Sequence, residues 1–211
     1  MDKTQMSIEV FDKCANAYQD KFMDLDLYHD SFDEFCNNIK KANADILDVA
    51  CGPGNITRYL LKHRPDFKIL GIDLSPKMMA LAQKNNPQAE FQVMDCRSIS
   101  ALNKQYDGLI CGFCLPYLSK EESIELIKNA SKVLTINGLI YISTMEDDYS
   151  QSGYKTSSSG DKMFIHYHEA DYLTQALNEN GFKIIDLHRQ IYTTQDESPT
   201  IDLIIIAEKY Q

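Results

Sequence analysis

A glycine-rich turn and an aspartate that follows it are the residues whose types and spacing suggest chemistry. The turn reads Gly52-Pro53-Gly54, follows the largely apolar segment 46–49 and precedes a helical pattern. Glycine lets a ligand approach where a Cβ would clash, and a helix N-terminus directs unpaired N–H groups into the same space. Asp73, nineteen positions after Gly54, offers two acceptor oxygens to the hydroxyls of a ribose. These residues predict a pocket for a nucleotide-like ligand.

The sequence of the turn narrows the class of ligand that it can bind. A dinucleotide fingerprint requires G-x-G-x-x-G, but Thr57 stands at the position of the third glycine. The sequence also has no G-x-x-x-x-G-K-[ST] segment, which excludes a P-loop. A ligand with a ribose but without a pyrophosphate therefore fits the turn better than a dinucleotide.

Strand-like and helix-like segments alternate from residue 45 onward and would position this pocket. Short apolar runs predict seven strands: 45–50, 67–72, 90–94, 106–111, 139–144, 182–189 and 201–208. Helical spacing and capping residues predict helices at 7–23, from Ser31, at 55–63, from Ser75, near 98–103, from Ser119 to Leu134, and at 169–180. Such alternation predicts an α/β fold in which helices cover both faces of a mostly parallel sheet. The last two strands follow each other directly, so we expect them to pair antiparallel.

The segment 146–162 interrupts this alternation. It is polar and rich in serine and glycine, so we interpret it as a long surface loop of the kind that often forms lids or binding loops. The two helices before the first strand lie outside the alternating core, and we expect them to cover the pocket. The sequence thus predicts one domain with a helical cap at 1–44, a core at 45–145, a substrate-side loop at 146–168 and a final part at 169–211.

The composition limits the classes of partner and the cellular compartment that we expect for this protein. The 211 residues carry a formal net charge of −10, which disfavours binding to a phosphate backbone. No apolar run approaches the roughly 20 residues that span a bilayer, and the first six residues do not form a signal peptide. Six cysteines without a secretory signal indicate a reduced, cytoplasmic protein. We expect neither nucleic acid nor a membrane as partner, and we leave a monomer and a homodimer open.

Five segments in the expected order resemble the motifs of the class I S-adenosylmethionine-dependent methyltransferases, which have a Rossmann-like sheet. They are Leu47–Gly54, Gly71–Met78, Val93–Cys96, Tyr106–Cys111 and Val133–Leu139. The resemblance covers roughly residues 45–145. It implies a three-layer fold with seven strands, one of them antiparallel, and S-adenosylmethionine as cofactor. We expect no metal at this site.

The resemblance implies roles for the residues around the turn. Asp48 would organise the turn and reach, directly or through water, the amino group of the methionine part. Gly52 and Gly54 would let the cofactor lie against the backbone, and Asp73 would bind both ribose hydroxyls. At position 50 the family usually has glycine, and we expect Ala50 to be tolerated there because alanine is the smallest alternative. Ala50 and the adjacent Cys51 belong to the expected cofactor site.

Other residues are expected around the two ends of the cofactor. Leu74 and Met78 would pack against the adenine. Asp95 would accept a hydrogen bond from the adenine amino group, while the Cys96 backbone N–H would donate to the ring. The methionine end would contact the residues Phe113 and Tyr18. A core or helix-packing role remains an alternative for Met78 and for Tyr18.

The acceptor side is less well defined because it falls in the segments that match least. The first motif is similar to that of enzymes of the trans-aconitate methyltransferase type, which implies a small-molecule acceptor. His166 and His168 follow the polar segment and are candidates for a general base, with a packing role as the alternative. Tyr117, Tyr154 and His166 are candidates for lining the acceptor pocket.

Three alternatives stay open at this point. The domain could bind the cofactor without catalysis, or it could be an NAD(P)-dependent oxidoreductase, which the absent third glycine opposes. Cys111 and Cys114 have the spacing of a redox or metal pair. No second pair accompanies them, and their strand context favours buried thiols.

Overall fold

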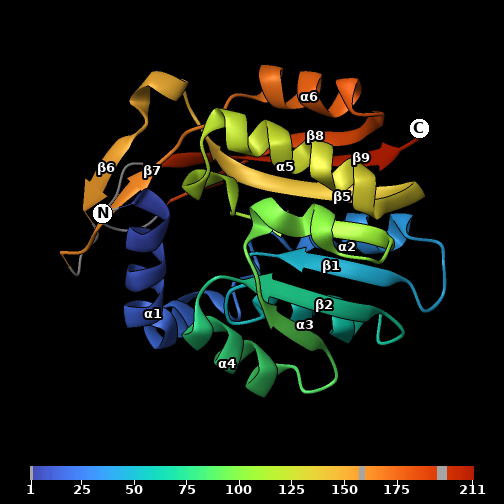
Figure 1. Cartoon of the computed structure of the whole chain (residues 1–211), viewed down its shortest axis with the longest axis horizontal. Helices are drawn as coiled ribbons and strands as arrows, with labels where there is room; N and C mark the ends of the chain where they lie inside the picture. Colours follow the sequence, from blue (N-terminus) through green and yellow to red (C-terminus); the bar gives the residue numbers. More distant parts are fainter. Residues whose placement is uncertain (1, 157–159, 194–198) are drawn as a thin grey trace.

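The computed structural model describes residues 2–156, 160–193 and 199–211. Seven strands form one sheet in the order β3-β2-β1-β4-β5-β9-β8 (Figure 1). Their bounds are β1 Asp45–Val49, β2 Lys68–Asp73, β3 Glu90–Val93, β4 Tyr106–Gly112, β5 Leu134–Glu146, β8 Phe182–Tyr192 and β9 Thr200–Lys209. Strands β3, β2, β1, β4 and β5 run parallel, while β9 pairs antiparallel with both β5 and β8. The predicted α/β fold with an antiparallel final pair is confirmed.

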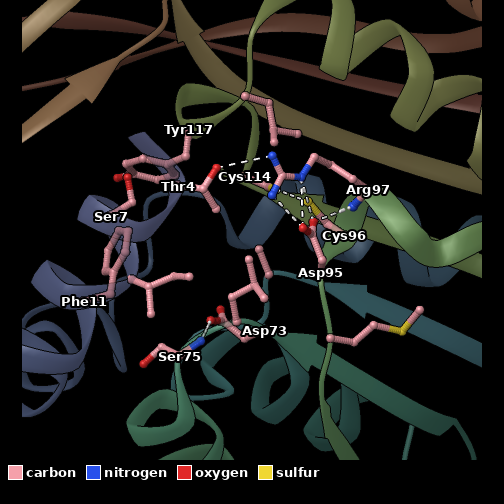
Figure 2. Close-up of a pocket in the computed structure, with 15 residues that line it drawn as sticks. Thr4, Ser7, Phe11, Asp73, Ser75, Asp95, Cys96, Arg97, Cys114 and Tyr117 are labelled. Carbon is pink, nitrogen blue, oxygen red and sulfur yellow. Dashed lines mark hydrogen bonds and ion pairs between the residues drawn. The ribbon is translucent and has the colours of Figure 1, made fainter. Parts of the chain in front are cut away.

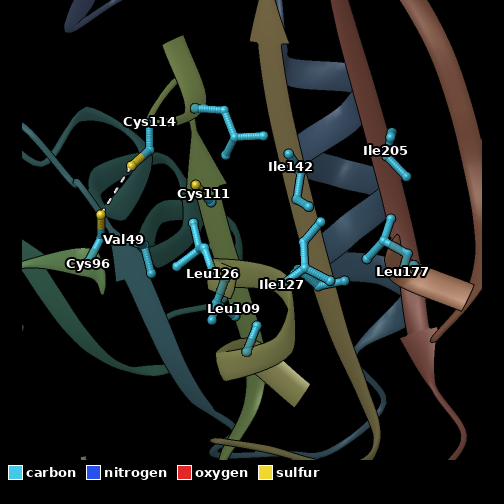
Figure 3. Close-up of a cluster of buried hydrophobic side chains, with 14 of the residues drawn as sticks. Val49, Cys96, Leu109, Cys111, Cys114, Leu126, Ile127, Ile142, Leu177 and Ile205 are labelled. Atoms are coloured by element: carbon cyan, nitrogen blue, oxygen red, sulfur yellow. Dashed lines mark hydrogen bonds between the residues drawn. The ribbon is translucent and has the colours of Figure 1, made fainter. Parts of the chain in front are cut away.

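Helices cover both faces of the sheet. On one face lie the short 3₁₀ helix η1 (Cys96–Ala101) and the helices α5 (Lys120–Val133) and α6 (Ala170–Glu179). Figure 3 shows Leu126 and Leu177 from these two helices against Val49, Ile142 and Ile205 of the strands. The opposite face is covered by α2 (His29–Asn38), α3 (Asn55–His63) and α4 (Pro76–Asn85). The central strands are therefore buried on both sides, which explains their nearly continuous apolar sequence.

The helix boundaries follow from capping groups that the sequence displays. Ser75 caps α4 because its Oγ accepts a hydrogen bond from the Met78 backbone N–H. Ser119 and Glu122 form the expected capping box at the start of α5. The predicted helix start at Ser31 is wrong, since α2 already begins at His29. The Ser31 hydroxyl lies inside the helix and donates to the Tyr28 carbonyl at 2.7 Å.

The segment predicted as a long loop is largely ordered as a hairpin. After the 3₁₀ helix η3 (Tyr149–Gln151), strands β6 (Gly153–Thr156) and β7 (Lys162–Ile165) pair antiparallel, and residues 157–159 lie outside the described part of the chain. The loop prediction is wrong for the two strands. A two-stranded ribbon with one face toward solvent need not carry a strongly apolar sequence, and tertiary packing holds this one. Strand β7 packs against the N-terminal helix α1 (Lys3–Phe22).

Helix α1 and the β6–β7 hairpin lie together at the edge of the sheet where the parallel strands end (Figure 1). Ligands of open α/β sheets bind at this edge, outside the carboxyl ends of the strands. The 3₁₀ helix η2 (Leu115–Tyr117) follows β4 at the same edge and contacts α1. Within the described residues, no helix combines the length and apolar character needed to cross a bilayer.

Candidate active site

The glycine turn after β1 is tied to the end of β2. The Asp73 carboxylate accepts the backbone N–H of Gly52 at 3.0 Å and that of Ser75 at 2.8 Å. The Cys51 N–H donates to the Ile72 carbonyl, also at 3.0 Å. Burial raises the pKa of Asp73 above its ordinary value, although these N–H groups counteract the rise. Each Asp73 oxygen retains acceptor capacity toward the cavity that this residue lines.

The two glycines of the turn meet different neighbours. Gly52 has a φ of +54°, and the nearest atom to a Cβ placed there would be a ring carbon of Tyr18 at 3.8 Å. Gly54 has a φ of +79°, and a Cβ there would lie 2.4 Å from Asn86 Nδ2 and 3.3 Å from Ala82 of α4. Gly52 therefore leaves space above the turn, whereas Gly54 permits close packing against α4.

Ala50 adopts a left-handed conformation, with a φ of +54°. A residue with a Cβ is strained in this region by about 1 kcal/mol, which gives a physical reason why glycine is usual at this position. Ala50 lines the cavity, as expected for a cofactor contact. The neighbouring Cys51 instead turns its side chain into a small apolar cluster with Met79 and Ala82, so its backbone alone belongs to the turn.

Asp48 is completely buried beneath the turn. One carboxylate oxygen, Oδ2, accepts the Thr57 hydroxyl at 2.6 Å. The other, Oδ1, has no hydrogen-bond partner among the described residues. Burial raises the pKa of Asp48 to about 7, although the bonds from Thr57 counteract it. A buried unpaired oxygen is costly, so this atom is suited to a donor group of a ligand or to a water.

A cavity of about 90 Å³ lies between the strand ends and α1. Figure 2 shows Thr4, Ser7 and Phe11 of α1 on one side, and Asp95, Cys96 and Arg97 on the other. Of the residues expected to bind cofactor, the cavity is lined by Ala50, Asp73, Leu74, Asp95 and Cys96. These come from the ends of β1, β2 and β3, as the motif order implied.

Met78 does not line this cavity. Its side chain is only 1% exposed and lies in α4, beneath the lining. Met94, at the end of β3, lines the cavity instead. The helical position of Met78 placed it correctly in the fold, but its direction within α4 was not visible in the motif.

Asp95 has a partner that the sequence did not indicate. The Arg97 guanidinium donates to both carboxylate oxygens, with Nη2 2.6 Å from Oδ2, and the Arg97 backbone N–H donates at 2.9 Å. Burial raises the pKa of Asp95, but these donors outweigh it and hold the pKa below its ordinary value. Arg97 Nη1 also reaches Glu122 at 2.9 Å and Thr4 at 3.2 Å. Arg97 therefore occupies much of the acceptor capacity of Asp95 that we expected to serve the adenine amino group. Its contacts with Thr4 and Glu122 also connect α1 to α5.

A second, larger hollow of about 1150 Å³ adjoins the cavity. It is enclosed by α1, the end of β5, the β6–β7 hairpin, the start of α6 and the β8–β9 pair. Phe11 and Tyr117 line both spaces, and their rings meet edge to face with centroids 5.0 Å apart. Tyr18 lines the hollow beside them, 5.8 Å from Phe11. We call Phe11, Tyr18 and Tyr117 the aromatic neck.

The two candidate bases do not line either space. His168 is completely buried, with Nε2 2.7 Å from the Leu115 carbonyl and Nδ1 bonded to the Tyr172 hydroxyl. Burial lowers the pKa of His168 to about 4, so it is neutral at physiological pH. His166 is 6% exposed, and its Nδ1 lies 3.1 Å from the Tyr149 hydroxyl. Both side chains hold the segment after β7 in place, in agreement with the packing alternative.

Two further expected contacts lie away from the cavities. Phe113 also has a left-handed φ of +57°, and its ring centroid lies 5.1 Å from that of Tyr28. Tyr154, on the β6–β7 hairpin, is 58% exposed and packs edge to face on Phe164. The structure thus keeps Tyr117 and Tyr18 at the junction of the two spaces but not Phe113 or Tyr154.

The Cys111 and Cys114 thiols are free and buried. Cys114 contacts the thiols of both Cys111 and Cys96, and its Sγ lies 3.7 Å from Cys96 Sγ. Among residues 2–156, 160–193 and 199–211, no group of three or more His, Cys, Asp or Glu side chains has an arrangement suited to a metal ion. The pair forms part of the apolar core that Figure 3 shows.

Comparison with known proteins agrees with this geometry. Residues 46–138 match the methyltransferase domain family. Trans-aconitate 2-methyltransferase of Variovorax paradoxus is 30% identical over 99 residues, which are 47% of this chain and 38% of that protein. The tRNA N(3)-methylcytidine methyltransferase trm141 of Schizosaccharomyces pombe is 29% identical over 143 residues, which are 64% and 57% of the two chains. The chain spans between 23% and 57% of the length of the curated relatives it matches.

The fold is shared with solved methyltransferases over nearly the whole chain. The magnesium protoporphyrin IX methyltransferase of Synechocystis PCC 6803, solved with bound S-adenosylmethionine, superimposes with a TM-score of 0.75. It is 16% identical, and the match covers 99% of this chain and 98% of that one. The chain therefore has the fold of the class I S-adenosylmethionine-dependent methyltransferases, and its residues 46–138 match a methyltransferase domain, so the resemblance seen in its motifs is confirmed.

Proposed function

We propose that this protein transfers a methyl group from S-adenosylmethionine to a small-molecule acceptor. The observation that carries the proposal is the pair of adjoining spaces at the carboxyl edge of the sheet. One is lined by Asp73, Asp95 and Ala50, which precedes the glycine turn, and the other is an open hollow. They share Phe11 and Tyr117 as a common wall. A transferase that aligns two substrates requires this arrangement.

The residues present fit the cofactor. The unpaired Asp48 Oδ1 and the open space above Gly52 are suited to a polar methionine end. Asp73 has acceptor capacity for the ribose hydroxyls, and Leu74 and Met94 offer apolar surface to the adenine ring. When bound, S-adenosylmethionine supplies an electrophilic sulfonium methyl group. We place that methyl group at the aromatic neck, between the two spaces.

The protein's own contribution is alignment and exclusion of water. Displacement at a sulfonium releases a neutral leaving group, so positioning and desolvation supply most of what catalysis needs. Tyr18 and Tyr117 are suited to this role because burial raises the pKa of each phenol, which keeps both neutral. Helix α1 covers the neck through Phe11 and is held to the core by Asp12, which accepts from the Lys77 N–H at 3.2 Å. We infer that α1 must separate from α4 when cofactor and product exchange.

The small size of the acceptor is also part of the proposal. The relative named for tRNA leaves a nucleic acid acceptor as a second candidate. The net charge of −10 opposes that candidate, and the trans-aconitate relatives support a small molecule. The six free cysteines support the reducing, cytoplasmic compartment expected from the sequence.

Binding and transfer are tested separately. Isothermal titration with S-adenosylmethionine and S-adenosylhomocysteine tests the cofactor, and Asp73→Asn is expected to weaken binding at least about tenfold, or about 1.4 kcal/mol. Asp66→Asn is the matched control, because Asp66 is bound by Arg64 on the surface, away from both spaces. Absence of cofactor binding to the wild-type protein refutes the proposal, as does NADH binding in preference to S-adenosylmethionine.

A labelled-methyl screen tests catalysis. A metabolite extract and total tRNA are supplied in separate reactions with cofactor carrying a labelled methyl group, and products are identified by mass. We expect label in one or a few small molecules. Label in tRNA alone favours the second candidate, and cofactor binding without any transfer favours a non-catalytic binding domain.

A further inference from the structure

The charged groups around the larger hollow are not evenly balanced. Among its described lining residues, five carboxylates face three cations. The carboxylates are Glu146, Asp147, Asp148, Glu169 and Asp171, and the cations are Lys21, Lys155 and Arg189. These groups lie away from the cofactor cavity, whose lining they do not share. They are therefore available to recognise the part of the acceptor that does not react.

The one guanidinium of the hollow is already paired. Arg189 donates to both oxygens of Glu146, with Nη2 2.8 Å from Oε1. Such a bidentate pair leaves little capacity for a second carboxylate. Lys155 has its ammonium 5.5 Å from the Tyr167 ring centroid, and Lys21 has its own 5.0 Å from that of Phe22. Among the described lining residues, these two lysines then face the four carboxylates that lie outside the Arg189–Glu146 pair.

Two further carboxylates lie in the wall at the start of α6 and form no ion pair among the described residues, although the charge of Asp171 acts on Arg189. Glu169 and Asp171 flank the start of α6, and neither has an ion pair or side-chain hydrogen bond among the described residues. Among the described residues, Asp147 accepts a hydrogen bond from the adjacent Asp148 backbone N–H, at 2.8 Å. This wall has negative charge that a cationic group of a ligand can neutralise at close range.

The aromatic neck favours the same class of ligand. The ring faces of Phe11, Tyr18 and Tyr117 attract cations through their quadrupoles. The neck also lacks a proton acceptor among its described residues, because burial raises the pKa of Tyr18, Tyr117 and the adjacent Cys14. A hydroxyl acceptor needs a base in the transition state, whereas an amine in its neutral form already has a free lone pair.

From this arrangement we infer that the acceptor is an amine, carried by a small molecule with a net positive charge. The inference rests on the proposed function for the methyl donor. The acceptor nitrogen, deprotonated in solution, forms the new N–C bond with its lone pair. The S–C bond breaks, and its electron pair remains on sulfur as a neutral thioether. The methylated product is an ammonium, and it releases one proton to water. Glu169 and Asp171 bind and orient the acceptor but do not react.

Two probes of similar size and opposite charge test the inference without knowledge of the acceptor. Benzylamine and benzoate are titrated into the full-length protein saturated with S-adenosylhomocysteine. We expect benzylamine to bind at least about tenfold more tightly, and its affinity to fall as salt is added. Equal affinities, tighter binding of benzoate, or no binding of benzylamine overturns the inference.

A variant and its control locate the effect. In the double variant Glu169→Gln with Asp171→Asn, benzylamine affinity should fall at least about threefold while S-adenosylhomocysteine affinity stays unchanged. Glu125→Gln is the matched control, because Glu125 pairs with Lys128 on the surface of α5 and should change neither affinity. An unchanged benzylamine affinity in the double variant also overturns the inference.

The methyl screen gives an independent reading. Labelled products are separated on cation and anion exchangers, and we expect the label in basic amines that bind the cation exchanger. Label in carboxylic esters or phenol ethers overturns this inference but leaves the proposed function intact. Failure of the proposed function would appear earlier, as loss of cofactor binding.

Discussion

Replacing Asp48 by asparagine should change how the stability of the fold depends on pH. Asp48 is fully buried, and burial raises its pKa from 3.8 to about 7. Between these values the folded protein holds a proton that the unfolded chain has released. The free energy of unfolding therefore falls as pH rises from 3.8, and it levels off above 7. Asparagine has the same size as aspartate, can accept the hydrogen bond from Thr57 and does not ionise in this pH range.

The size of the effect follows from the two pKa values. Because the folded state takes up this proton and resists losing it, the raised pKa of Asp48 lowers the free energy of unfolding by about 2 kcal/mol at about pH 5 and by about 4 kcal/mol at about pH 8. The stability difference between the wild-type protein and Asp48→Asn should therefore shift by about 2 to 3 kcal/mol between these conditions, in favour of the variant at the higher pH. Any constant effect of the substitution cancels in this comparison.

Urea unfolding followed by circular dichroism measures the shift in both proteins, without cofactor. Asp66→Asn is the control, because hydrogen bonds from Arg64 lower the pKa of Asp66. Its carboxylate is ionised in the folded state throughout this range, so its difference from wild type should stay nearly constant. If the Asp48 difference is the same at both pH values, the carboxyl is not perturbed and the reasoning is refuted.

Three further predictions concern single contacts. Gly54→Ala should destabilise the fold by about 2 kcal/mol or more in urea unfolding, because its Cβ would lie 2.4 Å from Asn86 Nδ2 in a left-handed backbone; a neutral result would contradict the packing role. Ser119→Ala should cost about 1 kcal/mol through loss of the α5 capping box and should leave cofactor affinity unchanged. His168→Phe should cost about 2 kcal/mol, because the Leu115 carbonyl loses its donor. If it instead abolishes transfer without loss of stability, His168 is catalytic.

The parallel strands could be predicted because their environment is uniform. A strand that is buried on both faces is mostly apolar, and β1, β2 and β4 each contain an apolar run interrupted by few charged residues. The β6–β7 hairpin escaped prediction for the opposite reason. Its side chains are largely exposed, and its order depends on α1, where Lys3 Nζ lies 3.3 Å from the Phe164 ring centroid. Contacts between such distant segments have no local signal.

The same distinction applies to the site. Asp73 and Asp95 were found because Asp73 ends β2 and Asp95 closely follows β3, and strand ends converge at one edge of a parallel sheet. Arg97 was missed although it lies two positions after Asp95. An arginine at that distance does not indicate that its side chain turns back, and the bidentate contact depends on the η1 turn and on Glu122 of α5. Phe11 was missed as a neck residue because an apolar helix face has the same sequence pattern whether it packs on the core or lines a cavity.

The Gly-x-Gly motif predicted the turn correctly, but the sequence could not distinguish the role of Gly52 from that of Gly54. A ligand that approaches the backbone and a helix that packs against it both require that no Cβ be present. Gly52 meets open space and Gly54 meets α4, yet the two letters are identical. Ala50 shows the opposite situation: it has a Cβ although its φ of +54° favours glycine. If that strain is relieved by Ala50→Gly, the gain of about 1 kcal/mol is offset by a similar entropic loss from the more flexible unfolded chain. A nearly unchanged stability is therefore expected, which explains physically why alanine can persist where glycine is usual.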